Sequence, residues 1–252
     1  MMVNIEMAGI QVTSAQGKKK MSEKSSLETI SAQISSSTIF NQSMVEAILN
    51  AYDMLSPYSA GRTSLVTSWT TCIGSILQID EAALKELEIS AMLCDVGMWA
   101  IPSYIINKKG RLTLSEFKLI QQHPTLTLNT LKALPISQAV HDNILFHHES
   151  FDGTGYPEGL EGDNIPLGAQ VINVACALFA LISPRPYRDP FEMDEAIEIL
   201  EREKGKQFNP KVVDALKQAY SEDKIEKASE SLVADPFSPI RRQIDLNFED
   251  NW

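Results

Sequence analysis

Three of the four histidines in this chain stand at expected helix ends, beside other side chains that could bind a metal ion or a phosphate. His147 and His148 are adjacent and directly precede residues 150–167, a stretch with four glycines and two prolines. Neighbouring positions on a helix point about 100° apart, so two such imidazoles can serve two metal ions, or one metal ion and one phosphate oxygen. His123 is the third. A vicinal pair by itself is more often structural than metal-binding, so these residue types alone leave the metal site open.

The apolar spacing predicts that helices position these histidines. Thr113 and Glu116 form a capping box that starts a short helix running to 122. Pro124 and Pro210 suit the first turns of two more helices, the first reaching about 134. Strand-like alternation is scarce, and the glycines and prolines of 150–167 exclude a helix there, so the predicted class is all-α with one long loop. Apolar residues at three- and four-residue steps predict the other helices over 44–55, 59–77, 81–97, 137–149, 168–182 and 193–203.

Composition bounds the function classes. With 252 residues, 44% of them hydrophobic, the chain can bury one large core, and we expect one main domain over 43–222. Residues 1–42 are predicted to be a flexible or short-helix leader, and 223–252 a polar extension. A net charge of -11 argues against general nucleic-acid binding unless basic side chains are gathered in one place. Three widely spaced cysteines and the lack of a long apolar run predict a cytoplasmic protein without membrane contact.

The stretch HHESFDGTGYP, residues 147–157, resembles the signature of the HD-GYP family of bacterial cyclic di-GMP phosphodiesterases. The resemblance covers about 165 residues, roughly 56–220, and implies an HD-domain helical bundle with a Gly-rich GYP loop. Its other segments are ISAMLCDVGMWAIP (89–102), INKKGRLTLSEFKLIQQHP (106–124), GLEGDNIPLGAQVINVACALFALISPRPYR (159–188) and GKQFNPKVVDAL (205–216).

The family implies two or three iron or manganese ions, a phosphate that bridges them and a metal-bound hydroxide as nucleophile. Measured against that pattern, four positions are replaced. Arg62 stands where the family has its first His ligand, and Cys94 where it has the His of the HD pair. Met98 replaces a lysine that would neutralise phosphate charge, and Cys176 replaces a late Asp ligand. The residual ligands are Asp95, His123, His147 and His148.

These replacements lead to the hypothesis of a degenerate signalling protein without catalytic activity and without a metal cofactor. The guanidinium of Arg62 would sit where a dication should bind, so we expect it to form an ion pair with Asp95, the remaining member of the catalytic pair. The first alternative is an active phosphodiesterase with an atypical iron or manganese site. The second is a single zinc ion held by Cys94 and Cys176 with His123 and another histidine, although buried cysteines are more often plain core residues.

Substrate-reading features are better retained. The resemblance implies that Tyr156, Arg185 and Arg188 bind cyclic di-GMP. An arginine can donate two hydrogen bonds to one phosphate, and a tyrosine ring can stack on guanine. Arg185, together with Asp152, could instead only tie the loop to the bundle. The family also associates the GYP loop with contacts to GGDEF-domain cyclases, so such a signalling protein is the expected partner. We predict that His141 lies at the surface and that Trp69, Phe117 and Phe146 belong to the core.

Overall fold

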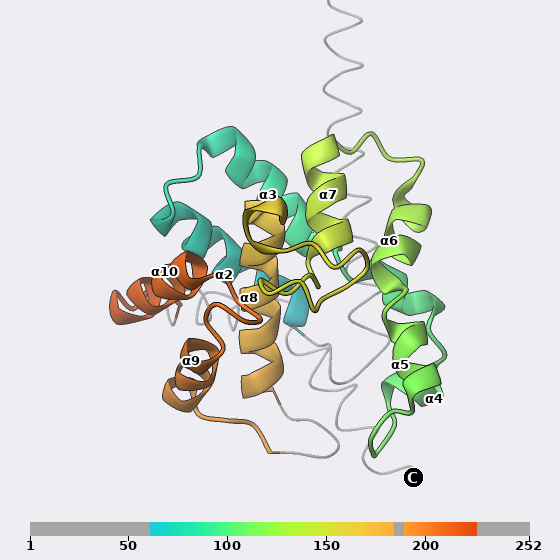
Figure 1. Ribbon diagram of the computed structural model, residues 1–252. Coiled ribbons are helices and arrows are strands. Elements are labelled where there is room, and N and C mark those ends of the chain that lie inside the picture. Colours follow the sequence, from blue (N-terminus) through green and yellow to red (C-terminus); the bar gives the residue numbers. More distant parts are fainter. Residues whose placement is uncertain (1–60, 184–188, 226–252) are drawn as a thin grey trace, which may run out of the picture. The chain divides into compact units, whose positions relative to one another are not determined.

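The computed structural model describes residues 61–183 and 189–225, and all regular structure in these ranges is helical (Figure 1). Two isolated bridges, Asp152 with Glu161 and Lys204 with Phe208, are the sole extended pairings in this part of the chain. The predicted leader, the helix over 44–55 and all but the first residues of the C-terminal extension lie outside the described residues. The all-α prediction is confirmed. Within the same ranges no helix is long and apolar enough to cross a membrane.

The core forms around α8 (Leu167–Ile182), which lies in the middle of Figure 1. Helices α2 (Arg62–Ile76) and α7 (Gln138–Phe146) pack against it, and so do α9 (Met193–Arg202) and α10 (Pro210–Ser221). Helix α3 (Glu81–Leu93) packs on α2 and α7. The side chains that fill this core are fully buried and include Trp69, Ile73, Leu87, Ile172, Leu178 and Leu216. The prediction that Trp69 is a core residue is therefore confirmed.

The helix that precedes the site ends earlier than predicted. The spacing extended it to Gly97, but α3 stops at Leu93 and a 3-10 turn, η1 (Val96–Ala100), follows. The reason is a side chain that competes for backbone groups. The hydroxyl of Thr127 accepts the Gly97 N–H at 2.8 Å and donates to the Cys94 carbonyl at 2.9 Å. A Cβ at Gly97 would lie 2.2 Å from the His123 carbonyl oxygen, so only glycine allows this close approach.

Local capping explains most of the other boundaries. The capping box at Thr113 is present and starts α5 (Leu114–Ile120). Asn209 caps α10 through its side chain, as predicted, and Pro210 is the first helical residue. Helix α6 (His123–Leu131) ends a turn before the predicted 134. Two short elements had no sequence signal: α4 (Ser103–Ile106), which follows Pro102, and the 3-10 turn η2 (Gly162–Asn164) inside the Gly-rich loop.

Candidate metal and ligand site

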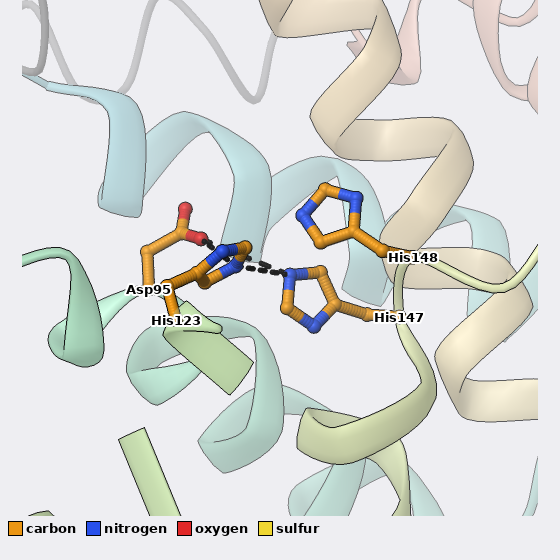
Figure 2. A group of neighbouring side chains, drawn as sticks. All are labelled: Asp95, His123, His147 and His148. Atoms are coloured by element: carbon orange, nitrogen blue, oxygen red, sulfur yellow. Dashed lines mark hydrogen bonds and ion pairs between the residues drawn. The ribbon is translucent and has the colours of Figure 1, made fainter. Parts of the chain in front are cut away.

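Four side chains from three parts of the bundle meet at one point (Figure 2). Asp95 comes from the turn between α3 and η1, His123 begins α6, and His147 and His148 follow the end of α7. Each offers one ligand atom, and these atoms all lie within 4.8 Å of one another. Asp95, His123 and His147 are buried, while His148 is partly exposed. The structure thus brings together all four residual ligands that the sequence predicted.

Backbone contacts fix the orientation of two imidazoles. The Nδ1–H of His123 donates to the Ile120 carbonyl at 2.8 Å, and the Nδ1–H of His147 donates to the Ile144 carbonyl at 2.7 Å. A carbonyl oxygen can only accept, so in the neutral rings the proton sits on Nδ1 and the Nε2 lone pair is left bare. Such a bond from the outer ring nitrogen is typical of metal-bound histidine.

The two bare nitrogens point at a carboxylate oxygen. His123 Nε2 lies 3.1 Å from Asp95 Oδ1 and 3.3 Å from His147 Nε2. His147 Nε2 is 3.7 Å from the same oxygen. Three acceptors that face one another repel unless a cation, either a proton or a metal ion, lies among them. This geometry therefore fits one divalent metal ion.

Burial keeps the imidazoles in the form that binds metals. Desolvation, followed by the charge of His147, lowers the pKa of His123 to about 3. Desolvation also lowers the pKa values of His147 and His148. Neutral imidazole and carboxylate suit zinc, iron or manganese, so the donor set agrees with several metals and selects none.

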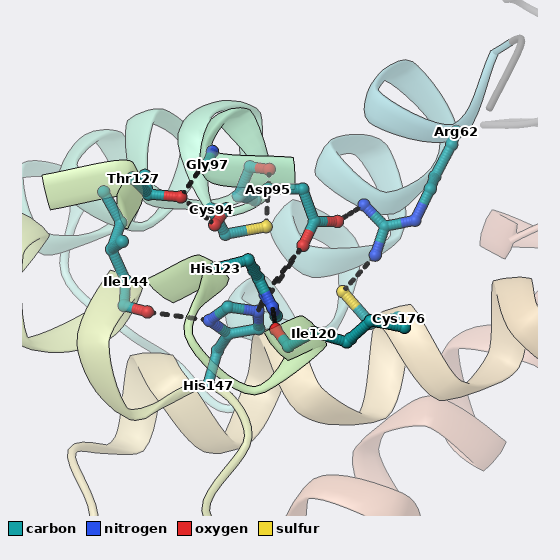
Figure 3. Close-up of polar contacts among 11 residues, drawn as sticks. Arg62, Cys94, Asp95, Gly97, Ile120, His123, Thr127, Ile144, His147 and Cys176 are labelled. Atoms are coloured by element: carbon teal, nitrogen blue, oxygen red, sulfur yellow. Dashed lines mark hydrogen bonds and ion pairs between the residues drawn. The ribbon is translucent and has the colours of Figure 1, made fainter. Parts of the chain in front are cut away.

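Arg62 occupies the other side of the carboxylate (Figure 3). Its Nη1 forms an ion pair with Asp95 Oδ2, the oxygen that the histidines do not use. Its Nη2 donates to the thiol sulfur of Cys176 at 3.4 Å. The predicted ion pair between Arg62 and Asp95 is therefore present. The Arg62 guanidinium neutralises this half of Asp95.

The two cysteines at the replaced positions make separate contacts. Cys94 and Cys176 are both buried, the Cys94 thiol donates to the Ala91 carbonyl at 3.4 Å, and the Cys176 sulfur accepts from Arg62 Nη2. The influence of the neighbouring Cys176 thiol lowers the pKa of Cys94, and that of the Cys94 thiol raises the pKa of Cys176. Among the described residues, the group of donors that could hold a metal contains neither cysteine. Met98, the fourth replaced position, is partly buried in η1.

Glu149 holds the GYP loop, and sequence reasoning missed this role. Its carboxylate is buried and accepts the backbone N–H groups of Glu158, Gly159 and Leu160 at 2.8 to 3.1 Å. Its own carbonyl accepts the Asn173 amide of α8 at 2.7 Å. The available signal was an acid directly before a loop rich in N–H groups that need acceptors.

Tyr156 covers one face of the His148 ring. Its N–H donates to the His148 carbonyl at 3.1 Å, and its ring stacks on the His148 ring with centroids 4.9 Å apart and planes 15° apart. Burial raises its pKa. Gly155 makes this fold-back possible, since a Cβ there would lie 2.1 Å from the Ser150 nitrogen.

Phe117 is not a core residue, and that prediction was wrong. It is 44% exposed and meets the Tyr156 ring edge to face, with centroids 6.4 Å apart. The reason is that α5 contains no buried residue and lies at the rim of the bundle.

The structure also places the other residues that the sequence singled out. Phe146 is partly buried, and His141 is partly exposed beside Asp142. Asp152 accepts the N–H and hydroxyl of Thr154, whereas Arg185 and Arg188 lie outside the described residues.

Comparison with known proteins gives the class. A family model described as HD domain matches residues 44–212, so the chain belongs to the HD domain family. Its relatives are HD-GYP phosphodiesterases. The cyclic di-GMP phosphodiesterase response regulator RpfG of Xanthomonas campestris is 37% identical over 145 residues, which are 56% of this chain and 38% of that protein. A cyclic di-GMP phosphodiesterase of Thermotoga maritima is 35% identical over 174 residues, which are 67% of this chain and 47% of that protein.

A third relative is named for a different substrate. The 3'3'-cGAMP-specific phosphodiesterase 3 of Vibrio cholerae is 34% identical over 179 residues, 69% of this chain and 39% of that protein. The chain thus spans less than half the length of these curated relatives. Among solved structures, the Bdellovibrio bacteriovorus protein Bd1817 has a TM-score of 0.54 at 20% identity, over 64% of this chain and 51% of that one. At this identity the likeness supports the fold alone.

Proposed function

We propose that this domain binds a cyclic dinucleotide as a signalling component and does not hydrolyse it by the multi-metal mechanism that the family resemblance implies. The observation that carries the proposal is the ion pair of Arg62 with Asp95 inside the cluster of potential ligands. The ligand class comes from the relatives, whose names specify cyclic di-GMP and 3'3'-cGAMP.

The charge of Arg62 opposes a second metal ion. The guanidinium stays protonated under all ordinary conditions. Two unit charges 4 Å apart near a protein surface repel by roughly 4 kcal/mol, and a dication beside a guanidinium by about twice that. A second dication at Asp95 Oδ2 therefore requires Arg62 to leave. Cys94 and Cys176, which are both buried, provide no carboxylate or imidazole in compensation.

One metal ion still fits the donors. His123, His147 and Asp95 Oδ1 would hold it, with His148 at the exposed side of the cluster. Such an ion would supply Lewis acidity toward a phosphate oxygen. Arg62 holds and neutralises the far oxygen of Asp95, and Tyr156 limits water access to His148 from one face. These contacts suit binding of a phosphodiester.

The alternative is a phosphodiesterase that works with this single-ion site. The convergence of three imidazoles and one carboxylate oxygen favours it. A purely structural zinc ion that uses Cys94 and Cys176 is a further reading, weakened because the two thiols bond the Ala91 carbonyl and Arg62 and neither belongs to the group of converging donors.

We also propose a protein partner, a GGDEF-domain cyclase, at the GYP loop. The support is that hydrogen bonds hold the loop at both of its flanks: the Glu149 carboxylate accepts three of its N–H groups, and the N–H groups of Phe151 and Asp152 donate to the carbonyls of Gln207 and Lys206. A fixed loop can present the same surface whether or not turnover occurs. Surface plasmon resonance with a purified GGDEF domain tests this, and equal binding after loss of loop order in Glu149→Gln would count against it.

The main test uses the full chain loaded in turn with manganese, iron and zinc. Elemental analysis gives the metal count, calorimetry gives binding of cyclic di-GMP and 3'3'-cGAMP, and chromatography detects linear product. We expect no more than one ion per chain, measurable binding and no linear product. Two iron or manganese ions with linear product would refute the proposal, and one ion with linear product would establish the alternative. One zinc ion without nucleotide binding would favour the structural reading.

A further inference from the structure

We infer that Phe117 is an outer stacking platform for one nucleobase of the cyclic dinucleotide, and that the basic segment around it attracts this anion. The inference rests on the proposed function, because it names additional residues for the same ligand. It concerns the rim of the site, where α5 and the GYP loop meet.

Three aromatic rings lead from the surface to the cluster. His148 belongs to the potential metal ligands, Tyr156 stacks on His148, and Phe117 meets Tyr156 edge to face. One face of the Tyr156 ring is thus covered by His148. Phe117 is 44% exposed, which leaves ring surface for a ligand. Aromatic rings stack on any purine, so an exposed phenylalanine two ring contacts from the cluster suits a base whose phosphate lies at the histidines.

The charge distribution singles out the same region. The chain as a whole has 33 acidic and 22 basic residues, yet residues 96–141 contain five basic residues and a single acid, Glu116. The basic residues of this segment are Lys108, Lys109, Arg111, Lys118 and Lys132. A dianionic ligand is repelled by the protein at large and attracted here, which raises its local concentration beside Phe117.

Most of the basic side chains in this segment are exposed to solvent. Lys109, Arg111 and Lys118 are exposed. Lys108 forms an ion pair with Glu116 at 2.6 Å. This pair and the capping box connect the residues before Thr113 to the first turn of α5. The positive charge near Phe117 is therefore presented to solvent.

The test is calorimetry of cyclic di-GMP with the full chain, its Phe117→Leu variant and a matched Leu114→Ala variant. Leu114 lies on the same helix and is 83% exposed, so its truncation reports on α5 and leaves the Phe117 ring in place. Loss of base stacking should weaken binding by about 5- to 100-fold in Phe117→Leu. Leu114→Ala should bind like the unchanged protein, and Phe117→Trp should regain the affinity.

Fluorescence distinguishes stacking from a general loosening of α5. A cyclic dinucleotide with 2-aminopurine in place of one guanine should be quenched on binding, and the quenching should be lost in Phe117→Leu and kept in Leu114→Ala. For the charge, Arg111→Gln should weaken binding at low salt and much less at high salt, whereas Lys211→Gln, an equal charge change on α10, should have little effect.

The failure of this inference differs from that of the proposed function. If the unchanged protein binds no cyclic dinucleotide, both the proposed function and the stacking role of Phe117 are refuted. If it binds, and Phe117→Leu binds equally tightly with unchanged quenching, the proposed function stands and the platform is refuted.

Discussion

Arg62 and Asp95 form an ion pair on the carboxylate oxygen that faces away from the histidines, so the same carboxylate meets a guanidinium on one side and bare imidazole nitrogens on the other. Asp95 can therefore bind a metal ion through Oδ1 without releasing Arg62. This division of the carboxylate links the two halves of the site and gives its first prediction.

Replacing Arg62 by alanine should destabilise the metal-free protein and strengthen its response to metal. The change leaves Asp95, which is 7% exposed, without its cationic partner. We expect a loss of about 1–3 kcal/mol, below the value for a fully buried pair because both side chains retain some solvent contact. Chemical denaturation with and without manganese measures the free energy of unfolding. Manganese should raise this free energy more in the variant than in the unchanged protein. Equal responses to manganese would contradict the account.

Restoring the four replaced positions together should restore metal uptake. The variant carries Arg62→His, Cys94→His, Met98→Lys and Cys176→Asp, which return the donors and the cation that the family resemblance implies. Elemental analysis should then give at least two iron or manganese ions per chain, and linear product should form from cyclic di-GMP. Cys72→Ser, at a cysteine outside the site, is the control. A folded variant with no added metal would show that lost ligands are not the explanation.

The sequence predicted the class of fold and the four converging ligands, because helical spacing, caps and a long motif are local signals. It did not predict where α3 ends, since that depends on Thr127, which lies 30 residues from Gly97 and competes for its N–H. It also missed the role of Glu149, whose three partners are nine to eleven residues away in an irregular loop. Phe117 was misplaced because helical periodicity does not reveal that α5 lies at the rim.

Glu149→Gln should loosen the GYP loop. An amide offers one oxygen where the carboxylate offers two, so at least one of the partly buried N–H groups of Glu158, Gly159 and Leu160 loses its acceptor. Because these groups retain some solvent contact, the cost should be about 1 kcal/mol, the low end of the range for an unsatisfied buried donor. Denaturation and limited proteolysis within 150–167 measure the effect, with Glu158→Gln, an exposed acid in the same loop, as control. Equal proteolysis of the two variants would rule out the proposed role of Glu149.

Gly155→Ala should disrupt the fold-back that places Tyr156 on His148. The added Cβ would lie 2.1 Å from the Ser150 nitrogen and 2.5 Å from the Glu149 Cα, both backbone atoms that cannot give way cheaply. A cost of about 1–3 kcal/mol is typical of such overpacking. Gly110→Ala is the matched control because a Cβ there meets nothing within 4 Å. Thermal unfolding should separate the two variants, and similar midpoints would mean that the loop adapts.

Acid should weaken α5 through Glu116. Its bonds with Lys108 and the Thr113 N–H lower its pKa from 4.5 to about 2. A carboxyl whose folded pKa is depressed stabilises the helix fully above its unfolded pKa and loses that contribution as the pH falls toward the folded value. Helical chemical shifts of α5 should therefore decline between about pH 4.5 and pH 2. In Glu116→Gln the decline should be absent and α5 weaker at neutral pH, because the titrating anion that closes the capping box is gone. Lys108→Gln should show the decline at a higher pH, since the largest of the contacts that hold Glu116 ionised would be lost.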